Sequence, residues 1–171
     1  FFDGALDHLR EVRAAVTTPL LRKDFVVTDY QVIEAATHGA DAVLLIVAAL
    51  DDASLSRLLA LAADLGLAAL VEVHDAGELD RALAAGAAIV GVNSRNLRTL
   101  AVNQATLDEL GPRIPSGVVA VAESGLRTAE DLQRLTAIRY DAFLIGERFM
   151  TLEDPAEGLR ALIEAAGKAP A

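Results

Sequence analysis

Residues 38–47 read His-Gly-Ala-Asp-Ala-Val-Leu-Leu-Ile-Val, and this succession of a small-residue turn and a short apolar run returns along the chain. It recurs at residues 85–90, Ala-Gly-Ala-Ala-Ile-Val, and more loosely at residues 139–144, Arg-Tyr-Asp-Ala-Phe-Leu. The apolar runs are too brief for helices and too continuously apolar for a sheet with one wet face, so they predict buried parallel strands. The repeating unit is therefore a helix, a small turn and a strand.

Six apolar runs of this kind predict six strands, and amphipathic helices fill the intervals between them. The predicted strands span residues 20–25, 42–47, 69–73, 89–92, 118–122 and 142–145. Residues 53–65 place leucines at helical spacing on one face, with Gly66 just past the end. Thr128 opens a capping-box pattern, Asp154 precedes a first-turn proline, and Asp29 is predicted to cap the helix that follows it.

The strict alternation of strand and helix predicts a parallel sheet with right-handed crossovers. An open doubly wound sheet and a closed barrel both satisfy this pattern. The chain has no G-x-G-x-x-G, which a dinucleotide-binding sheet carries after its first strand. Polar residues instead follow several strands, where barrels keep their chemistry. We therefore expect an α/β fold of the TIM-type (β/α)8 barrel class, incomplete here with about six parallel strands and helices outside, in which residues 1–171 form a single domain.

The composition limits the classes of function. Of the 171 residues, 53% are apolar and 23% charged, which suits a folded core. A net charge of -10 disfavours nucleic acid and anionic membranes as partners. The absence of cysteine excludes disulfides and thiolate chemistry, and His8, His38 and His74 lack metal-ligand spacing, so no metal site is indicated. The longest apolar run, residues 42–50, is shorter than the roughly 20 residues of a membrane span, and we expect a cytoplasmic location.

Charged and polar side chains interrupt or end the predicted strands. Lys23 lies within an apolar run. Burial removes water from its ammonium, and the free-energy cost is offset only if an anion pairs with it. Glu72 and Glu123 come from two other strands, and Asn93 ends a further one. Because strand ends converge at the mouth of a barrel, Lys23 and Glu72 are predicted to form an acid/base pair. The alternatives are a structural ion pair, or side chains that point outward to the helix layer.

Two glycine-containing turns follow the last two predicted strands. They are Glu123-Ser124-Gly125 and Ile145-Gly146-Glu147, each followed by a helix-forming stretch. Glycine lets backbone N–H groups approach an anion, and barrels frequently bind phosphate between the loops after their last two strands. These turns predict a phosphate site; the alternative is that both glycines only permit tight turns.

Five motifs, in order and spacing, resemble those of the indole-3-glycerol phosphate synthase family. They are Leu21-Arg22-Lys23-Asp24-Phe25-Val26-Val27, Val43-Leu44-Leu45-Ile46-Val47, Leu70-Val71-Glu72-Val73-His74, Gly91-Val92-Asn93-Ser94-Arg95-Asn96-Leu97 and Ala122-Glu123-Ser124-Gly125. The resemblance covers essentially the whole chain. It implies a barrel carboxy-lyase of tryptophan biosynthesis that converts 1-(2-carboxyphenylamino)-1-deoxyribulose 5-phosphate to indole-3-glycerol phosphate, releasing carbon dioxide and water without a cofactor.

The resemblance implies a role for each candidate residue. Lys23 resembles the general acid that protonates the substrate carbonyl, and Glu72 resembles the carboxylate that assists the proton transfers. The other catalytic candidates, beside the reacting substrate, are Asn93 and Ser124. The substrate-binding candidates are Phe25, Leu44, Arg95, Leu97, Leu100 and Glu123. Arg95 is a candidate from its place in the loop after a strand, where it orients the loop or binds substrate; the alternative is a solvated loop arginine. The phosphate-binding candidates are Gly125, Gly146 and Glu147, the last through its backbone amide because its carboxylate repels a phosphate dianion.

The start of the chain departs from the family pattern. Residues 1–6, Phe-Phe-Asp-Gly-Ala-Leu, resemble the loop after the family's second strand, so both preceding strands, with a Glu-x-Lys catalytic motif and a Ser-Pro-Ser loop, are expected to be missing. We therefore expect little activity from these 171 residues alone. Open sheet edges invite self-association. The alternative functions are a non-catalytic self-associating fragment and another phosphate-binding barrel enzyme such as phosphoribosylanthranilate isomerase.

Overall fold

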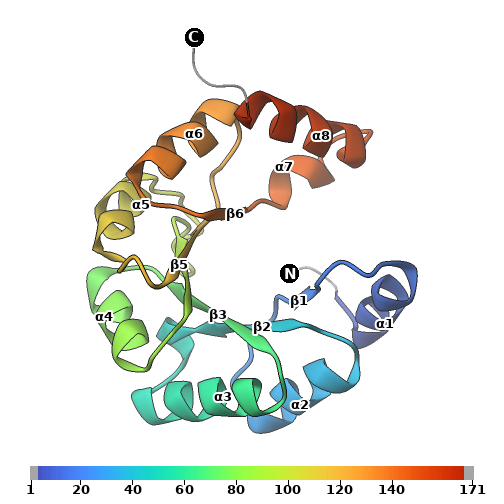
Figure 1. Cartoon of the computed structure of the whole chain (residues 1–171), viewed down its shortest axis with the longest axis vertical. Helices are drawn as coiled ribbons and strands as arrows, with labels where there is room; N and C mark the ends of the chain where they lie inside the picture. The colour runs from blue at the N-terminus through green and yellow to red at the C-terminus, as the bar shows by residue number, and fades with distance from the viewer. Residues whose placement is uncertain (1–3, 168–171) are drawn as a thin grey trace. The chain divides into compact units, whose positions relative to one another are not determined.

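A computed structural model describes residues 4–167, and strands alternate with helices along this part of the chain as predicted (Figure 1). The strands are β1 (Leu21–Arg22), β2 (Ala42–Ile46), β3 (Ala68–Val73), β4 (Ile89–Asn93), β5 (Val119–Glu123) and β6 (Ala142–Leu144). The α-helices are α1 (Leu6–Ala15), α2 (Asp29–Thr37), α3 (Asp52–Asp64), α4 (Ala76–Ala84), α5 (Ala105–Leu110), α6 (Ala129–Ile138), α7 (Glu147–Met150) and α8 (Pro155–Ala166). Two short 3₁₀ helices, η1 (Val47–Ala49) and η2 (Gly111–Arg113), follow β2 and α5. The motif expected at residues 1–6 falls partly outside the described residues.

The chain divides into two compact units. The first comprises the residues up to Val73 together with Gly77–Ile89, and the second comprises His74–Ala76 and the residues from Val90 onward. In the first unit β1, β2 and β3 follow one another in chain order and pair in parallel. In the second unit β4, β5 and β6 also follow chain order, and β5 pairs with β6 in parallel.

The core of the first unit lies between its strands and two helices. Figure 1 shows α2 and α3 side by side along β2 and β3. Leu55, Leu58 and Ala62 are fully buried on one face of α3, because helical spacing brings them to the same side. Removing these apolar faces from water is the main term that stabilises the unit.

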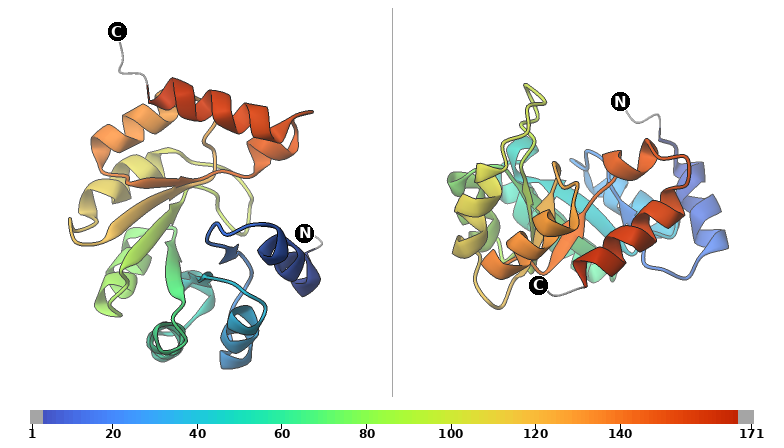
Figure 2. Two further views of the ribbon diagram at one scale, coloured as in Figure 1. Left: turned by 45° about the vertical axis from the view of Figure 1, so that its right-hand side comes forward. Right: turned by 90° about the horizontal axis from the view of Figure 1, so that it is seen from above.

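The second unit is organised around helices that cover β5 and β6. Figure 2 shows α6 and α8 lying side by side, and these two helices make direct contact. Tyr140 precedes β6 and is buried, with its hydroxyl donating to the Leu107 carbonyl at 2.9 Å. Burial raises the pKa of Tyr140 above its ordinary value, so the phenol stays protonated and keeps this hydrogen bond. The tyrosine thereby ties the start of β6 to α5.

Six strands are confirmed, but the first is shorter than predicted. The sequence predicts a strand over residues 20–25, whereas β1 covers only Leu21 and Arg22. The carboxylate of Asp24 accepts a hydrogen bond from the Phe25 N–H at 2.8 Å, and the Val26 N–H donates to the Asp24 carbonyl at 3.1 Å. This local turn competes with the strand ladder and ends it.

The predicted helix starts are confirmed at two helices and wrong at one. Thr128 and Asp131 form the capping box of α6, and the Asp154 carboxylate accepts from the Glu157 N–H at the start of α8. Asp29 does not cap α2. Thr28 does, because its hydroxyl accepts from the Gln31 N–H, which leaves the aspartate as the first helical residue.

In each unit, an aspartate directly before a strand binds the backbone of the preceding strand segment. The Asp41 carboxylate accepts from the Leu20 N–H at 2.7 Å and from Arg13 at 2.8 Å. Asp141 repeats this arrangement directly before β6, because its carboxylate accepts from the Ala120 N–H of β5 and from Arg139, both at 2.8 Å. The recurring sequence motif therefore has a structural meaning: its aspartate locks the register of the two strands that follow and precede it.

We expect Asp141→Asn to lower the free energy of unfolding at pH 7 by about 1 kcal/mol, because a neutral amide oxygen is a weaker acceptor than a carboxylate. The figure is small because the side chain is half exposed. The Ala120 N–H and then Arg139 hold the pKa of Asp141 below its ordinary value. Its stabilisation is therefore present above the unfolded pKa of about 3.9 and is lost as the pH falls through the folded pKa.

Urea denaturation of the full-length protein from pH 7 downward measures this effect. The difference between wild type and Asp141→Asn should shrink below about pH 4. Asp7→Asn is the control, because Asp7 pairs with Arg10 on the exposed surface of α1 and removing this charge should change stability by less than about 0.5 kcal/mol. A loss at Asp141 that stays constant with pH would contradict the assignment.

Candidate functional site

In the first unit, two adjacent cations, Arg22 and Lys23, point to opposite faces of the sheet. Arg22 ends β1, and its guanidinium lies 2.9 Å from the Glu34 carboxylate and donates to the Gln31 carbonyl, both in α2. Successive side chains of an extended chain point to opposite faces. Lys23 therefore points away from the helix layer, where its Nζ lies 3.3 Å from Oε2 of Glu72.

Glu72 is the buried member of this ion pair. It belongs to β3, its side chain is 1% exposed, and the Lys23 side chain is 43% exposed. The parallel register places Ile46 opposite Glu72 and Leu44 opposite Leu70, so the carboxylate shares one face of the sheet with apolar side chains. A carboxylate in such surroundings needs a cation or hydrogen bonds to remain ionised. The predicted pairing of Lys23 with Glu72 is therefore present, and it lies on the face opposite α2.

The choice of lysine at this position has a chemical meaning. The sequence contains 2 lysines against 13 arginines. In this unit, arginines form the described ion pairs Arg13–Asp41 and Arg22–Glu34. An arginine does not release its proton in the range where enzymes work, whereas a lysine ammonium does so readily when its surroundings change. Lys23 thus differs chemically from the arginines that form the neighbouring ion pairs.

The apolar candidates of the first unit differ in their exposure. Phe25 is 59% exposed and Leu44 is buried in β2. The backbone at Phe25 is fixed by the Asp24 carboxylate and by Gln31, whose side-chain amide donates to the Phe25 carbonyl at 3.0 Å. The Phe25 backbone is therefore held on an ordered turn two residues after Lys23, and its side chain is largely exposed.

In the second unit, polar residues end two strands. Asn93 ends β4 and is 7% exposed, and its Oδ1 accepts from the Arg95 N–H at 2.9 Å. Glu123 ends β5, is 1% exposed, and its carbonyl accepts from the Ser94 N–H at 3.0 Å. The structure thus brings the ends of β4 and β5 together, as the sequence predicts for neighbouring parallel strands.

The turn after β5 has an uncommon backbone. Ser124 has φ of 68° and Gly125 has φ of 69°, so two consecutive residues are left-handed. The Ser94 hydroxyl donates to the Ser124 carbonyl at 3.1 Å, and the Gln104 side-chain amide donates to the Gly125 carbonyl at 2.8 Å. No local sequence pattern singles out Ser94 or Gln104, because these contacts join segments that are distant in the chain.

Arg95 makes contacts within its own loop and with α7. Its guanidinium donates to the Leu100 carbonyl at 3.3 Å and forms an ion pair with the Glu147 carboxylate. Leu97 and Leu100 are exposed on this loop, and Leu100 has φ of 60°. Gly146 immediately precedes α7 and is exposed. The ion pair neutralises the carboxylate that would otherwise repel an anion near this glycine.

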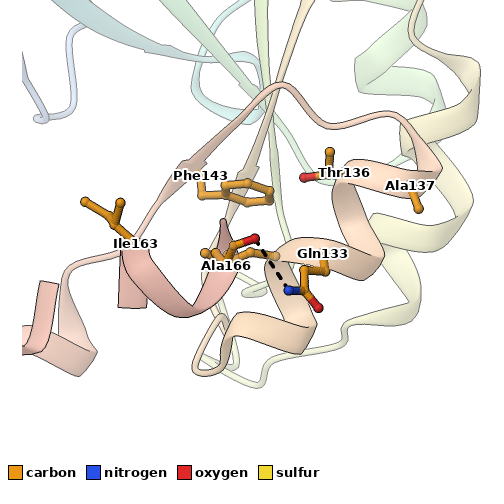
Figure 3. A pocket seen from close by; sticks show the side chains of 7 residues that line it. Gln133, Thr136, Ala137, Phe143, Ile163 and Ala166 are labelled. Carbon is orange, nitrogen blue, oxygen red and sulfur yellow. Dashed lines mark hydrogen bonds between the residues drawn. The ribbon is translucent and has the colours of Figure 1, made fainter. Parts of the chain in front are cut away.

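A pocket of about 550 Å³ lies elsewhere in the second unit, between α6, β6 and α8 (Figure 3). Phe143 pairs with Ala122 in the β5–β6 register, so its ring faces the helices while Glu123 faces the other side. Figure 3 shows Phe143 and Ile163 at this pocket, with Gln133 bonded to Ala166. Its lining residues include no titratable side chain, so the pocket offers no acid–base group.

Two further properties concern residues 4–167 as a whole. Each helix in this range is too short or too polar to span a bilayer. No group of three His, Asp or Glu side chains within the same range gathers closely enough to hold a metal ion.

Comparison with known proteins gives a family match. The sequence model of the indole-3-glycerol phosphate synthase family matches residues 1–162. The indole-3-glycerol phosphate synthase of Variovorax paradoxus is 52% identical over 165 residues, which are 96% of this chain and 62% of that protein. The enzyme of the same name from a Nocardioides species is 54% identical over 159 residues, which are 93% of this chain and 61% of that protein. The chain thus spans about three fifths of the length of these relatives.

Solved structures share the fold at much lower identity. KGPDC from Streptococcus mutans superposes with a TM-score of 0.73 at 16% identity, over 92% of this chain and 76% of that one. Mandelate oxidase with benzoyl-formic acid gives a TM-score of 0.71 at 20% identity, over 92% of this chain and 58% of that one. These similarities concern the fold alone. With the family match and the parallel strand–helix alternation, the predicted α/β, TIM-type class is confirmed.

The turn after β5 yields a stability prediction. A Cβ added at Gly125 would lie 2.6 Å from Cγ1 of Val102, whereas one added at Gly66, with a similar φ of 72°, meets nothing within 4 Å. We expect Gly66→Ala to cost about 1 kcal/mol, from the left-handed backbone alone. Gly125→Ala should cost about 2–4 kcal/mol, because overpacking against Val102 adds to the same backbone term. Equal losses in urea denaturation of the full-length protein would show that the Val102 contact is not rigid.

Proposed function

The chain belongs to the indole-3-glycerol phosphate synthase family, and on that premise we propose that it carries much of the active site of such a synthase. The substrate is 1-(2-carboxyphenylamino)-1-deoxyribulose 5-phosphate, and the product is indole-3-glycerol phosphate. In this reaction the aromatic carbon that bears the carboxylate bonds to the substrate carbonyl carbon. Carbon dioxide then leaves, the aromatic ring is restored, and the former carbonyl oxygen departs as water.

The observation that carries the proposal is the 3.3 Å contact between the Lys23 ammonium and the buried Glu72 carboxylate. Negative charge develops on the substrate carbonyl oxygen as the new carbon–carbon bond forms, and Lys23 donates a proton to it. Glu72 holds the ammonium in place and then assists the proton transfers that accompany loss of water. The half-exposed ammonium can reach a ligand, whereas the buried carboxylate provides a fixed counter-charge.

We assign the remaining contacts with the substrate to other strand ends and loops. Asn93 and Ser124 hydrogen-bond the reacting part, beside Glu123. An apolar wall around the aromatic ring is formed by Phe25, Leu44, Leu97 and Leu100. The exposure of Phe25, Leu97 and Leu100 supports this role, because large apolar side chains on ordered turns are available to a ligand.

The phosphate group is assigned to the backbone at Gly125, Gly146 and Glu147. The Arg95–Glu147 ion pair supports this assignment, because it compensates the only charge among these three residues. A phosphate held there lies away from the reacting atoms, so it contributes positioning rather than chemistry. Arg95 accordingly acts on the substrate through the loop and through Glu147.

Three further properties stay predictions. We propose a cytoplasmic location, consistent with the family's biosynthetic role. A single barrel domain remains our expectation for residues 1–171. Self-association through open sheet edges also remains a prediction.

We expect Lys23→Met and Glu72→Gln to lower kcat of the full-length protein by roughly 10²–10⁴-fold, the range for loss of general acid–base catalysis. Both substitutions keep the approximate size of the side chain while removing its charge. Steady-state formation of the indole product, followed by its fluorescence, measures the effect.

The matched control is Glu34→Gln, which disrupts the neighbouring ion pair with Arg22. Both members of that pair are mostly buried, at 11% and 16% exposure, so the variant should lose stability. Its kcat should stay within about twofold of wild type, because this ion pair faces α2 and not the proposed substrate. Near-normal kcat in both Lys23→Met and Glu72→Gln would contradict the proposed function.

A further inference from the structure

The turn formed by Ser124 and Gly125 requires something to hold it. Left-handed backbone is unfavourable for serine, and it persists only where the surroundings determine it. Here both residues of the turn are left-handed, with φ of 68° and 69°. A turn of this kind that presents backbone groups to a ligand must keep one conformation to bind well.

Two side chains fix the two carbonyl groups of this turn. The Ser94 hydroxyl donates to the Ser124 carbonyl at 3.1 Å, and the Gln104 Nε2 donates to the Gly125 carbonyl at 2.8 Å. A peptide unit is planar and trans, so each carbonyl oxygen points opposite to the N–H of the next residue. Fixing these carbonyls therefore directs the N–H groups of Gly125 and Leu126 away from Ser94 and Gln104.

The two donors are themselves anchored. The Ser94 N–H donates to the Glu123 carbonyl at 3.0 Å, and the Ser94 carbonyl accepts from the Asn103 N–H at 2.8 Å. Gln104 stands at the start of α5, where its carbonyl accepts from the Leu107 N–H at 3.0 Å. The side-chain amide of Gln104 thus reaches the turn from an ordered helix start. It connects α5 to the residue proposed to bind phosphate.

We propose that Gln104, assisted by Ser94, is a positioning residue for the phosphate group of the substrate. This inference rests on the proposed function, in which the backbone at Gly125 binds phosphate. Gln104 does not touch the phosphate. It acts through the Gly125 carbonyl, by holding the turn in the conformation that directs its N–H groups to the anion.

The test compares two glutamines of the same unit in the full-length protein. Gln104→Met keeps the length of the side chain and removes the donor without adding charge. Gln133→Met does the same at a position where the amide donates to the Ala165 and Ala166 carbonyls at 3.3 and 3.4 Å, which joins α6 to α8. The measurements are Kd for inorganic phosphate by calorimetry, KM and kcat for the synthase reaction, and Tm.

Gln104→Met should raise both Kd for inorganic phosphate and KM roughly tenfold, the effect of losing about one well-placed interaction. Its kcat should stay within about twofold, because a remote anchor contributes equally to the ground state and the transition state. Gln133→Met should leave Kd, KM and kcat unchanged, although it lowers Tm. Ser94→Ala should raise Kd and KM in the same direction by roughly threefold, and it serves as the test should Gln104→Met not fold.

The outcomes separate this inference from the proposed function. If wild type binds inorganic phosphate and Gln104→Met binds it equally well, the positioning role is wrong and the proposed function stands. The same conclusion follows if Gln133→Met weakens phosphate binding as much as Gln104→Met, since the effect is then general destabilisation. If wild type neither binds phosphate nor makes the indole product, the proposed function fails and the inference fails with it.

Discussion

The buried carboxylate of Glu72 is the constraint on which the candidate site depends. A carboxylate that is 1% exposed among apolar side chains is costly to ionise without a partner, and Lys23 supplies that partner from another strand. Lys23 points to the face that carries Glu72 because adjacent side chains of an extended chain alternate, and Arg22 takes the helix side, where it pairs with Glu34. Because the two side chains alternate, the arginine forms an ion pair with α2 and the lysine forms one on the opposite face.

The polar residues at the entries of the strands differ from those at their carboxyl ends in what they contact. At strand entries, Asp41 and Asp141 accept backbone N–H groups of the preceding strands and so set the register. At strand ends, Glu72, Asn93 and Glu123 are buried polar residues that register alone does not require. In barrels of this class the strand entries usually supply stability and the carboxyl ends carry the chemistry, and the proposed function uses the strand ends of this chain in the same way.

The sequence predicted what depends on local patterns and parallel register. Six strands, the caps at Thr128 and Asp154, and the meeting of Lys23 with Glu72 all follow from apolar period, cap chemistry and the convergence of strand ends. The prediction from sequence failed where a strand and a turn differ little in free energy, as at Asp24, whose turn ends the first strand early. It also missed Gln104, which reaches Gly125 across 21 positions, because a glutamine in a loop looks the same whether or not its amide has a distant partner.

An acidic chain with a net charge of -10 is at first sight a poor receptor for a phosphate ester. The placement of the acids is nevertheless compatible with the proposed phosphate site. Many carboxylates are committed to caps, strand entries and arginine partners, where their charge is compensated locally. Glu147 follows the same rule through Arg95. Because screening limits the reach of distant charges to about 8–10 Å at physiological salt, the field at the turns is governed by neighbouring groups. In the proposed site, backbone N–H groups therefore serve as the donors, and the side chains that hold their turn in one conformation matter as much as the donors themselves.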